Sequence, residues 1–239
     1  MSPMGEEVLR VVLIGARGKM GRFADELLRE TAGLEIVSRP RRGEVDVETL
    51  GLTGAQVGLD LTEAGQGGRH GMAMIAAGIA PVIGTSGVSL EENRCLDDAA
   101  RERGIGGLVV PNFSLGVWLL QRACDEAARF FPDAEIIEMH NKSKKDAPSG
   151  TALDTAERMS SARGFDAEQT LPIHSVRIPG LYSNQEVIFG GAGEVLRLRH
   201  ETYSPACFAA GIQAALRYAA SATGVGRGIG AAFETLGVR

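Results

Sequence analysis

The hydrophobic positions in the first half of the chain alternate between short continuous apolar runs and longer segments with apolar residues at helical spacing. The first run, residues 8–14, is rich in β-branched residues and is typical of a strand buried on both faces. The same criteria predict further strands at 34–38, 57–62, 81–83 and 105–110, and helices over 70–78 and 90–103. Alternating strands and helices predict an α/β fold with a Rossmann-type parallel sheet.

Two segments of this half carry more specific expectations. Residues 44–52 are polar, and we expect them to lie on the surface. In the helix over 70–78, Met72, Ile75 and Ala76 are expected to face the core. His70 lies on this helix rather than at a strand end, so we expect it to be structural or exposed.

The pattern changes after residue 113. A helix is predicted over 115–131, then a strand that ends at Glu138, and a second helix over 151–163. Three further strands follow with turns but no helix between the last pair, at 173–178, 186–189 and 194–200. We therefore expect a dinucleotide-binding domain over 1–112. A C-terminal α+β domain with an open mixed sheet over 113–211 would bind substrate and form the oligomer, and a helix over about 212–239 would pack back on the first domain.

A glycine turn follows the first strand directly. Gly15, Gly18 and Gly21 form a G-x-x-G-x-x-G variant between this strand and a helical segment. In that context, glycines let the backbone approach a pyrophosphate at the start of a helix. The alternative is a tight strand-to-helix turn without a ligand.

The end of the second predicted strand carries arginines instead of an acidic residue. Arg39, Arg41 and Arg42 stand where a dinucleotide fold usually selects its cofactor. Arginine accommodates the 2′-phosphate of NADPH, so we expect NADPH to be preferred and NADH to remain an alternative. A solvated, charged turn would explain the same residues.

The segment from Glu138 to Thr151 holds the densest group of titratable side chains. His140 can exchange a proton near neutral pH, and Lys144 follows four residues later. Pro148 suits the first turn of the next helix, while Ser149 and Thr151 can cap it. A helix start of this kind attracts carboxylate or phosphate. The simpler alternative is a capped helix behind a solvated basic loop.

Composition limits the classes of partner. With a net charge of -5, the chain is not expected to bind nucleic acid. Its three cysteines lack the spacing of a metal site, so no metal is expected. No apolar segment is long enough for a signal peptide or a membrane span, which favours a cytoplasmic protein.

Four motifs taken together resemble the dihydrodipicolinate reductase family. They are the glycine turn 15–21, the strand end 84–87, the segment 111–117, and above all 138–152, which contains Lys-x-Asp-Ala-Pro-Ser-Gly-Thr. The resemblance spans nearly the whole chain in order. It implies a homotetramer that transfers a hydride from NAD(P)H to 4-hydroxy-tetrahydrodipicolinate, a cyclic imine dicarboxylate, in lysine and diaminopimelate biosynthesis.

The resemblance also assigns roles to individual residues. His140 and Lys144 match the catalytic proton donors, and Asn141, Ser149, Gly150 and Thr151 match the substrate-binding positions. Besides Arg39 and Arg41, the expected cofactor-binding residues are Gly15, Ala16, Gly18, Lys19, Met20, Gly84, Thr85, Ser86, Pro111, Asn112 and Phe113.

Some positions depart from the family pattern. Asn141 replaces a usual histidine, and Pro205 stands where an arginine usually holds a substrate carboxylate. Trp118 and Gln185 also replace the family's common residues, an asparagine and a histidine. Either Lys142 or Arg177 compensates for the missing arginine, or the substrate is a different small cyclic imine. A non-catalytic NADP-binding regulator is the third alternative.

Overall fold

The computed structural model describes residues 8–41, 43–163 and 171–236. It divides into two compact units, which are described separately here. The first unit comprises Met1–Phe113 and Phe208–Arg239, and the second comprises Ser114–Cys207. Among the described residues, no helix is both long and apolar enough to cross a membrane.

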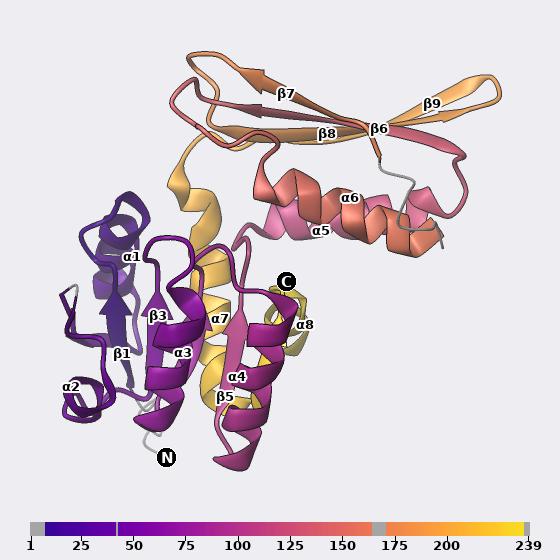
Figure 1. Cartoon of the computed structure of the whole chain (residues 1–239). Helices are drawn as coiled ribbons and strands as arrows, with labels where there is room; N and C mark the ends of the chain where they lie inside the picture. Colours follow the sequence, from indigo (N-terminus) through magenta and orange to yellow (C-terminus); the bar gives the residue numbers. More distant parts are fainter. Residues whose placement is uncertain (1–7, 42, 164–170, 237–239) are drawn as a thin grey trace, which may run out of the picture. The chain divides into compact units, whose positions relative to one another are not determined.

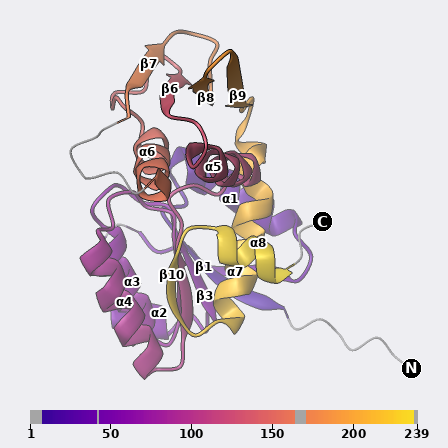
Figure 2. The same cartoon turned by 90° about the vertical axis from the view of Figure 1, so that its right-hand side faces the viewer.

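The first unit is built on a six-stranded, fully parallel sheet (Figure 1). In spatial order its strands are β10 (Gly224–Arg227), β5 (Gly106–Val109), β4 (Ala80–Ile83), β3 (Val57–Asp60), β1 (Leu9–Ile14) and β2 (Leu34–Ser38). Helices α2 (Val47–Gly51), α3 (Gly67–Ala76) and α4 (Leu90–Glu102) cover one face, and α1 (Lys19–Glu30), α7 (Ala209–Ser221) and α8 (Gly230–Leu236) lie on the other (Figure 2). The expected Rossmann-type parallel sheet is confirmed.

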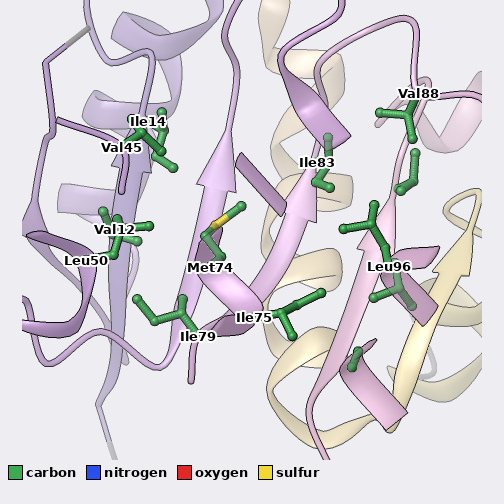
Figure 3. Close-up of a cluster of buried hydrophobic side chains, with 13 residues drawn as sticks. Val12, Ile14, Val45, Leu50, Met74, Ile75, Ile79, Ile83, Val88 and Leu96 are labelled. Atoms are coloured by element: carbon green, nitrogen blue, oxygen red, sulfur yellow. The ribbon is translucent and has the colours of Figure 1, made fainter. Parts of the chain in front are cut away.

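The core of this unit lies between the sheet and helices α3 and α4. Met74 and Ile75 on α3 and Leu96 on α4 pack against Val12 and Ile83 of the strands (Figure 3). All five side chains are at most 1% exposed. Burial at this scale, at about 25 cal/mol per Å² of apolar area, is the main force that holds helices on a sheet.

Three details of the first unit differ from expectation. Ile75 is buried as expected, but Met72 is 42% exposed and Met74 takes its place in the core, because α3 begins at Gly67 and buries the face that contains Met74 and Ile75. The segment 44–52 contains helix α2, which is capped by Asp46 and buries Leu50. The segment 212–239, expected as one helix, contains the rest of α7, then β10 and α8.

The second unit has a four-stranded mixed sheet, as the sequence predicted. Its order is β7 (Ile173–Arg177), β6 (Asp133–His140), β8 (Ser183–Gly191) and β9 (Glu194–His200), and only the β6–β7 pair is parallel. Helices α5 (Leu115–Ala128) and α6 (Gly150–Arg163) cover one face of this sheet (Figure 1). A short 3₁₀ turn, Pro205–Phe208, precedes α7.

The strand β6 determines what faces those helices. Ala134, Ile136 and Glu138 alternate as buried residues along it, so a carboxylate occupies a position that its neighbours fill with apolar side chains. The strand was expected to end at Glu138 but continues to His140, because both flanking strands pair with it there. His140 is therefore held on a strand, on the same face as Glu138.

Candidate active site

The turn between β1 and α1 requires glycine for steric reasons. Gly15 has a φ of +86°, and a Cβ there would lie 2.6 Å from the carbonyl oxygen of Leu61. A Cβ on Gly21 would lie 2.0 Å from the carbonyl oxygen of Gly15. Gly18 is the N-cap of α1 and provides no side-chain hydrogen bond to the first turn. The helix start thus has the tight approach and the uncapped N–H groups that suit a pyrophosphate.

The other residues expected at this turn are all at least partly exposed and so accessible to a ligand. Ala16 and Met20 are half-buried, and Gly18 and Lys19 are exposed. None of these side chains takes part in the buried core between the sheet and α3 and α4. The local structure therefore fits a dinucleotide phosphate, and the cofactor-binding role of these residues stays a prediction.

The arginines after β2 differ in their surroundings. Arg39 Nε donates to Asp25 Oδ1 on α1 at 2.5 Å, and Arg29 pairs with the same carboxylate at 2.7 Å. Arg41 is exposed, and its backbone N–H donates to Glu44. Arg42 lies outside the described residues. Asp25 thus holds one guanidinium near the carboxyl end of β2, which is where a 2′-phosphate would bind.

A buried carboxylate organises the carboxyl ends of β3 and β4. Asp60 accepts hydrogen bonds from the N–H and hydroxyl of Thr62 and from the Thr85 hydroxyl, and His70 Nδ1 lies 3.0 Å from it. Burial raises the pKa of Asp60, but the hydrogen bonds from His70 and Thr62 outweigh it and leave this pKa below its ordinary value. His70 therefore has the structural role that its helical position suggested.

Other residues expected at the nicotinamide side surround this network. A Cβ on Gly84 would lie 2.6 Å from the Phe113 ring, so glycine is needed where that ring packs. Thr85 is buried and its hydroxyl is bound to Asp60, whereas Ser86 is exposed. Of the segment after β5, Pro111 is exposed and Asn112 is half-buried. Thr85 can therefore offer a ligand its backbone rather than its hydroxyl.

In the second unit, His140 is held at both ring nitrogens. Its Nδ1 lies 2.5 Å from Glu138 Oε2, and its Nε2 lies 3.1 Å from the hydroxyl of Ser183 on β8. The Glu138 side chain is fully buried, while that of His140 is 12% exposed. A carboxylate can only accept, so the Nδ1 atom carries the proton and Nε2 faces the hydroxyl.

The charges around this pair set its protonation. Burial lowers the pKa of His140, the positive charges of Lys144 and Arg177 lower it further, and Glu138 opposes both effects. Burial alone would raise the pKa of Glu138, but hydrogen bonds, chiefly from Arg177, hold it below its ordinary value. The pair consequently rests as a carboxylate beside a mostly neutral imidazole.

The loop after β6 is ordered by its own polar side chains. Asn141 Oδ1 accepts from both the N–H and the hydroxyl of Ser143. Lys144 Nζ pairs with Asp146 Oδ2 at 2.7 Å, and its backbone N–H donates to Asn141. Lys144 is 28% exposed and Asp146 62% exposed, so the ammonium group is held in place while remaining accessible.

At the start of α6, Ser149 rather than Thr151 provides the side-chain cap. Ser149 is buried at the N-cap position, where its hydroxyl accepts from the Ala152 N–H and its own N–H donates to Glu138 Oε1. Pro148 precedes this cap and does not lie in the first helical turn. Gly150 is exposed, with open space where a Cβ would be. The first N–H groups of α6, at Gly150 and Thr151, are therefore the ones suited to a carboxylate.

Arg177, one of the two candidates to compensate for the arginine missing at Pro205, is hydrogen-bonded within its own unit. It donates to both oxygens of Glu138, at 2.8 and 2.6 Å, and also to the backbone carbonyl of Asp146 at 2.8 Å. Gln185 is buried and donates to Thr155, so it lies in the helix-facing core of the sheet. The Arg122 guanidinium lies over the Trp118 ring, with its Cζ atom 5.0 Å from the centroid of that ring. Lys142, the other candidate, is exposed, and the choice between the two stays a prediction.

Asp60, Glu138 and Ser183 were not identified as site residues from the sequence, and Arg177 was considered only as a substitute for the arginine missing at Pro205. For Glu138, one signal was available, because an acidic residue at a buried position of an alternating strand needs a partner. The same logic applies to Asp60 at the end of β3, where the whole strand is buried. The partners themselves depend on strand register and carry no sequence signal.

Comparisons with known proteins agree with this geometry. The family model described as dihydrodipicolinate reductase, N-terminus, matches residues 9–113, and the one described as its C-terminus matches residues 116–228. The 4-hydroxy-tetrahydrodipicolinate reductase of Coxiella burnetii (strain Dugway 5J108-111) is 39% identical over 221 residues, which cover 87% of this chain and 92% of that protein. Its counterpart in Symbiobacterium thermophilum is 40% identical over 232 residues, with 88% and 91% covered.

A solved structure is similar over the same extent. Dihydrodipicolinate reductase from Paenisporosarcina sp. TG-14, with dipicolinate bound, has a TM-score of 0.80 and 31% identity, and the match covers 93% of this chain and 98% of that one. Fold and site together define the class of two-unit reductases that use NAD(P)H. Within that class, the chain belongs to the dihydrodipicolinate reductase family. The family expected from the sequence is thereby confirmed.

Replacing Gly15 with alanine tests the cofactor turn. We expect Gly15→Ala to weaken NADPH binding by at least about tenfold, because the new Cβ would push Leu61 and the turn apart. Gly43→Ala is the matched control, since Gly43 also has a positive φ, +90°, but open space around it. Fluorescence titration with NADPH measures both affinities. Equal affinity in the two variants would contradict the assignment of this turn.

Proposed function

We propose that this chain reduces 4-hydroxy-tetrahydrodipicolinate with NAD(P)H in the biosynthesis of diaminopimelate and lysine. The observation that carries the proposal is the arrangement of His140, a half-buried imidazole held by a buried carboxylate that also binds the start of α6. A proton donor and an anion-binding helix start on one rigid frame suit an imine dicarboxylate. The relatives named above carry this activity in their names.

The residues divide the chemical work. When bound, NAD(P)H would supply the hydride, which adds to the conjugated imine that forms when the 4-hydroxyl group leaves the substrate as water. His140 Nε2 donates the proton that completes the reduction, and Lys144 stabilises the negative charge that develops on the substrate. A dicarboxylate near His140 favours the imidazolium form and so offsets the lowered pKa of the free site.

The substrate carboxylates require two anion-binding groups. The N–H groups of Gly150 and Thr151 at the start of α6 suit one carboxylate, and the Asn141 side-chain amide can add a hydrogen bond. Lys142 is exposed in the same loop and is the remaining candidate for the second carboxylate. As a point charge, Lys142 would hold that group less rigidly than a bidentate arginine.

Pro205 and the ion pair of Arg177 favour one alternative substrate class, a small cyclic imine with fewer carboxylates. A non-catalytic NADP-binding regulator is disfavoured, because such a protein has no need for the hydrogen bonds at both His140 nitrogens.

By family resemblance, we also propose a homotetramer located in the cytoplasm. Ile178 and Val195 of the second unit are 50% and 61% exposed, and such apolar side chains suit an interface between copies.

The first test is the oxidation of NADPH in the presence of 4-hydroxy-tetrahydrodipicolinate. The substrate would be made in place from pyruvate and aspartate semialdehyde by a purified synthase. We expect turnover with a KM in the range of about 1 μM to 1 mM, typical of enzymes. NADPH binding without turnover would refute this substrate and leave the other cyclic imines to be assayed.

Removing either of the two proposed catalytic side chains should slow the chemical step. We expect His140→Ala and Lys144→Ala each to lower kcat by about 10²- to 10⁴-fold, the usual contribution of positioned acid catalysis. His174→Ala is the control, because His174 lies on the adjacent strand β7 with its side chain 56% exposed. Steady-state kinetics with circular dichroism would separate loss of activity from loss of fold. Near-normal kcat in both variants would exclude these roles.

The preference for NADPH is tested at Arg39. A charged hydrogen bond to the 2′-phosphate is worth about 1.5 to 3 kcal/mol, so Arg39→Ala should lower kcat/KM for NADPH by about 10- to 100-fold. The value for NADH should stay nearly unchanged. Arg29→Ala is the matched control, because it removes the other partner of Asp25. An equal effect of Arg39→Ala on both cofactors would contradict the preference.

A further inference from the structure

Glu138 joins three parts of the second unit through one carboxylate. Its Oε2 lies 2.5 Å from His140 Nδ1 and accepts from Arg177 Nη1 at 2.8 Å. Its Oε1 accepts from Arg177 Nη2 at 2.6 Å and from the Ser149 N–H at 3.2 Å. The proton donor, the helix start and an arginine therefore share the same buried group.

Strand register explains how these groups meet. Glu138 and His140 are two residues apart on β6 and so point to the same face. In the parallel pairing with β7, His140 lies opposite Arg177, whose guanidinium reaches back to Glu138. In the antiparallel pairing with β8, His140 lies opposite Ser183. Both nitrogens of the imidazole are thus fixed by neighbours on the sheet, rather than by the loop that follows.

The hydrogen bond to Glu138 has a chemical consequence for His140. A neutral imidazole carries one proton, and the partner of one nitrogen decides which nitrogen keeps it. Since an ionised carboxylate only accepts, the proton stays on Nδ1, and Nε2 is left to gain and release the exchanged proton. Arg177 keeps Glu138 ionised and holds it at two points.

We propose that Glu138, held by Arg177, is a positioning residue that fixes the tautomer and orientation of His140 and thereby makes Nε2 the proton-donating atom. This inference rests on the proposed catalytic role of His140. Glu138 does not itself touch the substrate. Its bond to the Ser149 N–H also links the orientation of the acid to the start of α6, where a carboxylate is proposed to bind.

The charged groups that face His140 together set its pKa and therefore the expected pH dependence of kcat. Glu138 comes from its own strand, Arg177 from β7 and Lys144 from the following loop, while β8 contributes the neutral Ser183. Of these described groups, Glu138 alone favours the imidazolium. Its replacement by glutamine therefore lowers the pKa of His140 and shifts the corresponding limb of the kcat profile to lower pH.

The chain contains a matched control for a glutamate–histidine pair. Glu135 on the same strand pairs with His174 at 2.8 Å, but both side chains are more than half exposed. Glu135→Gln removes the same kind of interaction from the same strand without affecting His140. A difference between Glu138→Gln and Glu135→Gln therefore reports on position rather than on the general loss of a carboxylate.

The experiment combines kinetics with ¹⁵N NMR of the histidine rings, which is practical because the chain has only 4 histidines. For the wild type, we expect His140 as the Nδ1–H tautomer at a pH where the ring is neutral. For Glu138→Gln, we expect kcat to fall by about 10- to 100-fold with KM for the imine nearly unchanged, and the pKa of His140 to decrease. Glu135→Gln should match the wild type in each readout.

Two outcomes overturn the inference. The first is a wild-type His140 in the Nε2–H tautomer, which can be observed without any variant. The second is a Glu138→Gln enzyme with normal kcat and an unchanged pH profile. If Glu138→Gln does not fold, Arg177→Lys takes its place, because it keeps the positive charge but loses the two-point hold; an unchanged kcat there also overturns the inference. Normal turnover of His140→Ala would instead refute the proposed catalytic role of His140 on which the inference depends, and would leave the proposed reaction standing.

Discussion

The arrangement of the candidate active site depends on burying one carboxylate, Glu138, without leaving it unpaired. An isolated buried carboxylate costs several kcal/mol, and the cost is offset only when its lone pairs are satisfied. Arg177, His140 and the Ser149 N–H provide that satisfaction from β7, β6 and the start of α6. Removing any one of them would leave part of the charge uncompensated. The side chains of the candidate site are therefore held as rigidly as those of a packed hydrophobic core.

The first unit solves a similar problem with Asp60. This carboxylate is also fully buried at the end of a strand, and it accepts from a histidine, two hydroxyls and a backbone N–H. The two networks differ in their exposure, because the His70 side chain is 5% exposed, whereas the His140 side chain reaches 12% and adjoins an accessible loop. Hydrogen bonds to a buried carboxylate thus fix the end of a strand in the first unit and the titratable ring of His140 in the second.

The sequence predicted the elements that local periodicity determines. It did not predict the elements and contacts that depend on which strands pair with each other. Strand β1 is a continuous apolar run, and the glycine turn after it is local, so both could be predicted. Strand β10 has a single apolar residue, Val225, and exists because its backbone pairs with β5. Glu138 and Arg177 are 39 residues apart and meet only through the register of β6 and β7. Single-sequence patterns contain no information on that register.

The same register sets what it would cost for Arg177 to bind a substrate carboxylate. Arg177 is opposite His140 and close to the anion-binding helix start, but moving it to a substrate carboxylate would leave Glu138 buried with its charge unpaired. The cost of that exchange exceeds the roughly 1.5 to 3 kcal/mol that a charge-assisted hydrogen bond provides. In the proposed function, a second carboxylate is therefore better bound by a group outside the network. Lys142 meets that condition, because it is exposed and carries its charge on a flexible stem.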